Sequence, residues 1–361
     1  MLARATMHHC NSAIAALLLA GAVAAISAQK PSRPAAPSSP QTPSLTVDHD
    51  PVRSPDAAGT NYSAGEVRKE AGGYVLRQDV EEVILNATVL DGNRLVQDLQ
   101  KENFTVFEDG VKQNVISFQH TDLPVSIALV VDNSGSMSKK RPAVNQSALD
   151  LIQASNPQDE AFVVNFSDEA FIDQEFTSDV RRLRDGLAHI ESRGGTALYD
   201  AVVASADKLA ADARRAKQVL VLITDGEDNA STLNLEQTIR RVQQLSGPVI
   251  YSVGLLFGDE MSHSEVRHAR RALEMLSTET GGIAYFPKSL EQIDQIAAEV
   301  ARDIRSQYTI GYHSSKPSTD TSFRHVQVLA EQKGTKLNVR TRTGYFPVPR
   351  KPKKTASQSG Q

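Results

Sequence analysis

Residues 125–136 read Val-Ser-Ile-Ala-Leu-Val-Val-Asp-Asn-Ser-Gly-Ser. The first seven are nearly all apolar, and a continuous apolar run predicts a strand that is covered on both faces of a parallel sheet. The turn that follows carries the carboxylate of Asp132 and the hydroxyls of Ser134 and Ser136. Hard oxygen donors of this kind are the ligands that Mg²⁺ prefers. We therefore expect a metal-binding loop directly after a buried strand.

Two later segments are placed to complete such a site. Gly194-Gly195-Thr196 precedes an apolar helical stripe, and Thr224-Asp225-Gly226-Glu227 follows a second apolar run. Open α/β sheets gather their ligands at the carboxyl ends of the strands, so the Thr196 hydroxyl and the Asp225 carboxylate are expected beside the first loop. Taken alone, Asp132 and Ser134 also fit a helix N-cap, and Asp225-Gly226 fits a simple turn. The three segments together favour the metal site.

The central part of the chain, from residue 125 to about residue 303, alternates apolar runs with amphipathic segments, which is typical of a parallel α/β sheet. Four runs predict strands, at residues 125–131, 161–166, 219–223 and 249–255. Helical apolar stripes cover residues 198–209, 235–245 and 290–304. The second helix has a start signal in Asn234 with Gln237 and a stop signal in Gly247-Pro248. The predicted fold class is α/β, with a doubly wound, mostly parallel, Rossmann-like sheet.

The segments on either side of this region have the alternating pattern of β-strands. Before it, residues 83–89 alternate, and Asp91-Gly92-Asn93 and Glu108-Asp109-Gly110 are turn signals. Residues 115–118 are expected to be the return strand of the second hairpin. After Gln307, the alternation recurs at residues 308–312, 326–328 and 337–339. We expect the two flanks to pair into one flanking β module.

These residues resemble a von Willebrand factor A (VWA) domain over roughly half of the chain. The resemblance is carried by Asp132-x-Ser134-x-Ser136, Gly195-Thr196 and Thr224-Asp225-Gly226, which occur in the family's order. The flanks, at residues 102–110, 307–312 and 342–346, resemble an exported bacterial VWFA-related group described mainly from acidobacteria.

The resemblance implies a metal-ion-dependent adhesion site (MIDAS). Ser134 and Ser136 would coordinate the ion directly, Thr196 would be a direct or switchable ligand, and Asp132 and Asp225 would act through water. The implied cation is Mg²⁺, with Mn²⁺ or Ca²⁺ as alternatives. An Asp or Glu side chain of a protein partner would complete the coordination.

The N-terminus has the pattern of a secretory signal peptide, with an apolar stretch over residues 13–26 and a cleavage site after Ala28. An uncleaved membrane anchor is the alternative, although the stretch is short for a span of about 20 residues. Cys10 is the only cysteine and precedes the apolar stretch. We expect an exported protein, periplasmic or extracellular, without a membrane span after cleavage. The net charge of −4, from 39 basic and 43 acidic residues, gives no support for nucleic-acid binding.

The expected organisation follows from these patterns. It comprises a signal peptide (1–28), a disordered Pro/Ser/Ala-rich linker (29–75), an N-terminal β segment (76–122), a VWA domain (123–306), a C-terminal β segment (307–348) and a disordered basic tail (349–361).

The functional hypothesis is a metal-dependent protein-binding or adhesion module rather than an enzyme. Two alternatives stay open. One is a structural envelope protein whose metal braces the fold. The other is a metal-dependent hydrolase, for which Glu227 is the nearest candidate base. The sequence does not identify the partner or the oligomeric state.

Two further groups of residues invite a functional interpretation. His263-x-Glu265-x-x-His268 could bind zinc, but histidines five apart do not share a helical face, so we expect a solvated helix start. Asp168, Glu169 and Asp173 are expected to form a solvated acidic loop and edge.

Overall fold

The computed structural model describes residues 46–47, 82–154, 156–188, 193–245, 247–258, 261–317 and 320–347. The expected signal peptide, the basic tail and all of the expected linker except residues 46–47 lie outside this part of the chain. Within it, no helix is both long enough and apolar enough to span a bilayer.

The central domain is built on a sheet with the strand order β1-β9-β8-β7-β10-β11-β12. Strands β8, β7, β10, β11 and β12 run parallel to one another, whereas β9 is antiparallel to β8 and β1 runs parallel to β9. The bounds are β1 Thr46–Val47, β7 Val125–Asp132, β8 Glu160–Phe166, β9 Ala170–Thr177, β10 Lys217–Thr224, β11 Val249–Gly254 and β12 Ala284–Tyr285. The predicted doubly wound, mostly parallel sheet is confirmed, and the four predicted strands are found within two residues of their expected ends.

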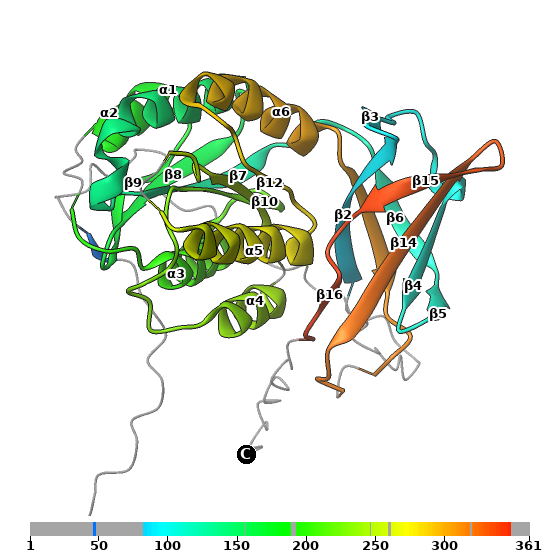
Figure 1. The fold of residues 1–361 in the computed structure, drawn as a ribbon. Coiled ribbons are helices and arrows are strands. Elements are labelled where there is room, and N and C mark those ends of the chain that lie inside the picture. The colour runs from blue at the N-terminus through cyan, green and yellow to red at the C-terminus, as the bar shows by residue number, and fades with distance from the viewer. Residues whose placement is uncertain are drawn as a thin grey trace, which may run out of the picture. The chain divides into compact units, whose positions relative to one another are not determined.

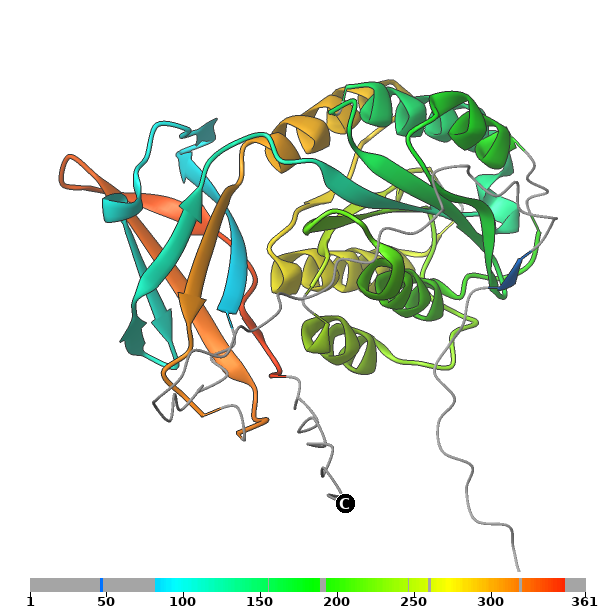
Figure 2. The same cartoon turned by 180° about the vertical axis from the view of Figure 1, so that it is seen from behind.

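Helices cover both faces of this sheet (Figures 1 and 2). One layer contains α1 (Arg141–Gln153), α2 (Val180–Ala188) and α6 (Ile293–Arg305); the other contains α3 (Leu198–Asp212), α4 (Leu235–Gln244) and α5 (His263–Thr280). Strand β7 supplies both cores because its side chains alternate between the two faces. Leu129 packs with the first layer, and Val130 packs with the second.

The predicted helix start signals are present in the structure. The side chain of Asn234 accepts a hydrogen bond from the backbone N–H of Gln237 at 2.9 Å, which opens α4 with a capping box. Ser262 and Glu265 form the same arrangement at the start of α5. The segment from His263 to His268 is therefore the first part of a helix, as expected.

The second sheet is formed by both flanks, in the order β5-β4-β14-β15-β2-β13-β6. The N-terminal flank gives β2 Glu82–Asp91, β3 Arg94–Leu95, β4 Phe104–Glu108, β5 Val111–Gln113 and β6 Val115–Gln119. The C-terminal flank gives β13 Tyr308–His313, β14 Arg324–Gln332, β15 Thr335–Arg340 and β16 Gly344–Tyr345. Strands of the two flanks are interleaved in the sheet, with Leu85 opposite Ile310 and Val106 opposite Val328. The expected flanking β module is confirmed.

One strand pairing was predicted wrongly. Residues 115–118 do not return along β4; that place is taken by β5, with Val106 opposite Gln113. The reason is the turn at Asp109 and Gly110, whose φ angles of 46° and 79° suit a two-residue hairpin loop. The return strand therefore begins at once, at Val111, and β6 pairs with β13 instead.

The end of α6 is bonded to the β module through the buried side chain of Asp303. Its Oδ2 accepts a hydrogen bond from the Tyr251 hydroxyl at 2.5 Å, and its Oδ1 accepts one from Nη2 of Arg340 at 2.5 Å. Arg340 lies on β15 and Tyr251 on β11. Burial raises the pKa of Tyr251 well above its usual value, so its hydroxyl keeps the proton that it donates. A single carboxylate thus links three elements.

Candidate metal centre

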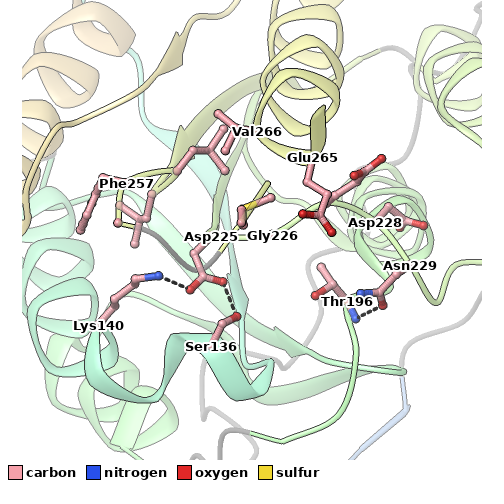
Figure 3. A pocket seen from close by; sticks show the side chains of 15 residues that line it. Ser136, Lys140, Thr196, Asp225, Gly226, Asp228, Asn229, Phe257, Glu265 and Val266 are labelled. Atoms are coloured by element: carbon pink, nitrogen blue, oxygen red, sulfur yellow. Dashed lines mark hydrogen bonds and ion pairs between the residues drawn. The ribbon is translucent and has the colours of Figure 1, made fainter. Parts of the chain in front are cut away.

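Three loops bring the predicted site residues together (Figure 3). Ser134 and Ser136 follow β7, and their hydroxyl oxygens lie 3.1 Å apart. The Ser136 hydroxyl donates to Oδ1 of Asp225, which follows β10, at 2.8 Å. Thr196 precedes α3, and a Cβ atom built on Gly226 would lie 3.3 Å from its hydroxyl oxygen. Ser134 and Asp225, 91 positions apart in the sequence, therefore meet at the carboxyl ends of the neighbouring parallel strands β7 and β10, and Thr196 lies beside them.

Asp132 is fully enclosed beneath these groups. Its Oδ1 accepts a hydrogen bond from the backbone N–H of Ser134 at 2.8 Å, and its Oδ2 accepts one from the Thr224 hydroxyl at 2.5 Å. Burial raises the pKa of Asp132 to about 6, although these hydrogen bonds act in the opposite direction. Both oxygens are thus engaged by the protein, an arrangement suited to shaping the loop and to contacting an ion through water.

Two basic residues at the start of α1 lie against the acidic groups. Nζ of Lys140 lies 2.5 Å from Oδ2 of Asp225. Arg141 is buried and donates to the backbone carbonyl of Asp132 at 3.3 Å and to Oδ1 of Asn165 at 3.1 Å. Burial lowers the pKa of Arg141 to about 10, while the negative charge of Asp132 raises it. Neither residue had a spacing signal in the sequence that pointed to this site.

The loop that carries Thr196 is held from two sides. Its backbone N–H donates to Oδ1 of Asn229 at 2.8 Å, and the backbone N–H of Asn229 donates back to the Thr196 carbonyl at 3.0 Å. The N–H of Gly195 donates to Oδ1 of Asp168 at 2.7 Å. Gly194 has a φ of 80° and no room for a Cβ, which would lie 2.3 Å from Oδ2 of Asp168. Asp168 is exposed, as expected for a solvated acidic loop, and it also braces the loop that carries Thr196.

The two acidic residues after Gly226 have other contacts. Oδ2 of Asp228 accepts from the backbone N–H of Tyr199 at 3.1 Å and from the Ser231 hydroxyl, so this carboxylate caps the start of α3. Burial raises the pKa of Asp228. Oε1 of Glu227 lies 3.3 Å from Nδ1 of His268. Both carboxylates are thus engaged by neighbouring groups of the protein.

The donor set fits a small hard cation. Within the described ranges there is no cluster of three or more His, Cys, Asp or Glu residues that could hold a metal ion. The oxygens that converge are instead the hydroxyls of Ser134, Ser136 and Thr196, with carboxylates beside them. This set of ligands suits Mg²⁺ better than a metal that prefers thiolate or imidazole ligands. Asp225 already has a cationic partner within the protein, because its Oδ2 lies 2.5 Å from Nζ of Lys140.

Fold and site together define an α/β domain with a candidate cation site at the carboxyl ends of its strands. Residues 127–227 match the sequence profile of the von Willebrand factor type A domain. The central domain of this chain is a VWA domain, as the resemblance implied. The narrower resemblance of the flanks to one exported bacterial group stays a prediction.

The chain is similar to several characterised or solved proteins. It is 25% identical over 262 residues to inter-alpha-trypsin inhibitor heavy chain H4 from Homo sapiens, covering 66% of this chain and 27% of that protein. It therefore spans about a quarter of that relative's length. Among solved structures, a von Willebrand factor type A protein from Catenulispora acidiphila has 14% identity and a TM-score of 0.42, covering 69% of this chain and 75% of that one. Proximal thread matrix protein 1 from the mussel byssus, with a zinc-occupied MIDAS motif, has 18% identity and a TM-score of 0.41, covering 55% and 50%.

Proposed function

We propose that this protein is an exported binding module whose VWA domain captures an acidic side chain of a protein partner through a bound divalent cation. The cation is Mg²⁺ in the first place, with Mn²⁺ or Ca²⁺ as alternatives. Its site consists of five side chains: Asp132, Ser134, Ser136, Thr196 and Asp225.

The observation that carries the proposal is that three of these side chains line one cavity. Ser136, Thr196 and Asp225 line a cavity of about 220 Å³ (Figure 3). An ion at this place would be held from below and would be reachable from outside. Mg²⁺ demands near-octahedral geometry and gives up its waters reluctantly, so it keeps an exchangeable position when few carboxylates bind it directly. A carboxylate of a partner can replace that water and gains a strong ionic contact.

The exported location rests on residues 1–28, which have the composition of a signal peptide. The mature chain would contain no cysteine, so an exported form could not be stabilised by disulfides. Its stability would come from the buried cores and the ion.

The test combines metal binding with partner capture from the native cell envelope or medium. Calorimetric titration with Mg²⁺ should show one site, and captured protein should elute with EDTA. The Ser134→Ala variant should lose both properties, whereas Ser138→Ala, an exposed serine of the same loop, should keep both. Partner binding that persists in EDTA would contradict the proposal. If chelation lowered the melting temperature while binding survived, the metal would only brace the fold.

A further inference from the structure

The cavity above the candidate metal centre has two chemically different walls. Phe257 lies on the side of Lys140, whereas Glu265 lies on the side of Thr196 (Figure 3). Leu255, Leu256, Met261 and Val266 are the other large apolar residues of the lining, and together with Phe257 they are called the apolar wall. Glu227 and Asp228 also line the cavity, and together with Glu265 they are called the acidic wall. A ligand that reaches the ion must pass between them.

Most of the apolar wall is not explained by packing of the domain. Leu255 is buried and Phe257 packs against the core beneath α1, α2 and α6. Leu256, Met261 and Val266, however, are partly exposed and belong to none of the three core clusters of the described residues. Large apolar side chains that line a polar cavity without joining a core offer an apolar contact to whatever enters. Burying a leucine-sized side chain there contributes to affinity in proportion to the area removed from water.

The acidic wall sets a limit on the charge of the ligand. The described lining residues carry one positive charge, on Lys140, and four carboxylates. These carboxylates belong to Asp225, Glu227, Asp228 and Glu265. A divalent cation at the bottom of the cavity therefore leaves the lining with a negative balance. One ligand carboxylate is attracted by the ion itself. A second one, beside the first, would lie near Glu227 or Glu265 and would be repelled.

We propose that the cavity recognises a protein segment in which a single Asp or Glu lies next to a large apolar residue, and that it rejects segments with a second acidic neighbour. The acidic residue meets the cation, and the apolar residue packs against Leu256, Met261 and Val266. This inference rests on the proposed function and specifies the partner's sequence at the point of contact.

The test uses the full-length protein with three capped hexapeptides in Mg²⁺, measured by calorimetry. The first peptide has Asp-Leu at its centre and the second has Asp-Ser. The third has Glu-Asp-Leu. The Asp-Leu peptide should bind about tenfold more tightly than Asp-Ser. The Glu-containing peptide should bind several-fold more weakly than Asp-Leu, and this difference should shrink at high salt.

Variants test whether the apolar wall causes the preference for Leu and whether the acidic wall causes the rejection of a second acidic residue. Met261→Gln and Leu256→Gln should reduce the Asp-Leu preference to about twofold without changing Mg²⁺ affinity, since neither residue is in a core cluster. Glu227→Gln should restore binding of the Glu-containing peptide. Ser134→Ala is the control that should abolish binding of every peptide.

The outcomes separate this inference from the proposed function. If Asp-Leu and Asp-Ser bind equally in Mg²⁺, or if Met261→Gln and Leu256→Gln leave the preference unchanged, the inference is overturned while metal-dependent capture stands. If no peptide binds in Mg²⁺, or if binding is the same in EDTA, the proposed function itself is overturned.

Discussion

Nζ of Lys140 lies 2.5 Å from Oδ2 of Asp225, and both side chains are almost completely enclosed, with exposed fractions of 11% and 0%. The same Asp225 accepts a hydrogen bond from Ser136 through its other oxygen. The protein therefore places a cation of its own on the carboxylate that we propose to serve the metal. An ammonium group and a divalent ion at this place would repel each other, so we expect Lys140 to lower the affinity of the proposed site for its cation.

The Lys140→Met variant should bind Mg²⁺ about ten- to a hundredfold more tightly, since a positive charge within a few ångströms is removed from a partly enclosed site. The metal-free variant should lose about 2 kcal/mol of stability, because Asp225 loses a charged hydrogen bond. Calorimetry and thermal unfolding in EDTA measure the two effects. Lys139→Met, at an exposed neighbouring lysine, is the matched control and should change neither. Equal Mg²⁺ affinities of the wild type and Lys140→Met would show that the ammonium does not oppose the ion.

The Asn229→Ala variant should weaken Mg²⁺ binding about tenfold, the size of effect seen when groups that orient metal ligands are removed. Asn229 positions Thr196 through its side-chain oxygen, at 2.8 Å from the Thr196 backbone nitrogen. Asn229→Asp keeps an oxygen acceptor there and should retain most of the affinity. Titrations with Mg²⁺ measure the affinity of both variants. Equal losses of Mg²⁺ affinity in the two would point to a different role for the Asn229 side chain.

Lys217 should give the protein a stability that rises with pH above neutrality. Burial lowers the pKa of its ammonium to about 8, although Asp303, Asp122 and Asp159 raise it. Its usual pKa is 10.5, so between these values the unfolded chain holds a proton that the folded chain has released. The free energy of unfolding therefore increases from about pH 8 to about pH 10.5, by up to about 3 kcal/mol.

Urea unfolding at several pH values checks this expectation. The slope between pH 8 and pH 10 should be present in the wild type and in Lys112→Met, an exposed control, and absent in Lys217→Met. His120, whose pKa is lowered by burial, titrates below this window. An unchanged slope in Lys217→Met would assign the effect to another group.

The Arg324→Met variant should destabilise the β module by about 3–5 kcal/mol, because it leaves a buried carboxylate without its cation. Glu108 is 1% exposed, and its Oε1 lies 3.5 Å from Nη1 of Arg324. The hydroxyls of Tyr312 and Tyr345 donate to its Oε2 at 2.7 and 2.9 Å. Replacing both charged residues by methionine should recover much of the loss. Chemical denaturation of the single and double variants measures this, and a double variant as unstable as the single one would refute it.

The parts of the fold that the sequence predicts well are those with one dominant pattern. Strands β7, β8, β10 and β11 are covered on both faces and therefore consist of apolar runs. Helix α1 was not predicted, because its inward side includes the buried polar residues Arg141 and Ser147, which interrupt the apolar stripe. Strand β9 was also missed, since polar residues such as Asp173 alternate with its buried ones.

The candidate site shows the same division. Asp132, Ser134 and Ser136 lie in one turn of the chain, so their proximity can be predicted directly from the sequence. The contacts of Lys140 with Asp225 and of Asn229 with Thr196 join residues 85 and 33 positions apart. They depend on how loops from different strands fold over one another, and no local pattern encodes that. The metal ligands themselves stay a prediction until an ion is measured.

The chain passes from β6 into the VWA domain and returns from it into β13. These two strands are direct antiparallel neighbours, with Gln119 opposite Thr309. A tensile load applied to the strands of the module would pass across this pair without stretching the inserted domain. The same adjacency makes the domain exchangeable: a short hairpin turn could bridge Gln119 and Tyr308, yielding a miniature scaffold onto which other recognition domains could be grafted.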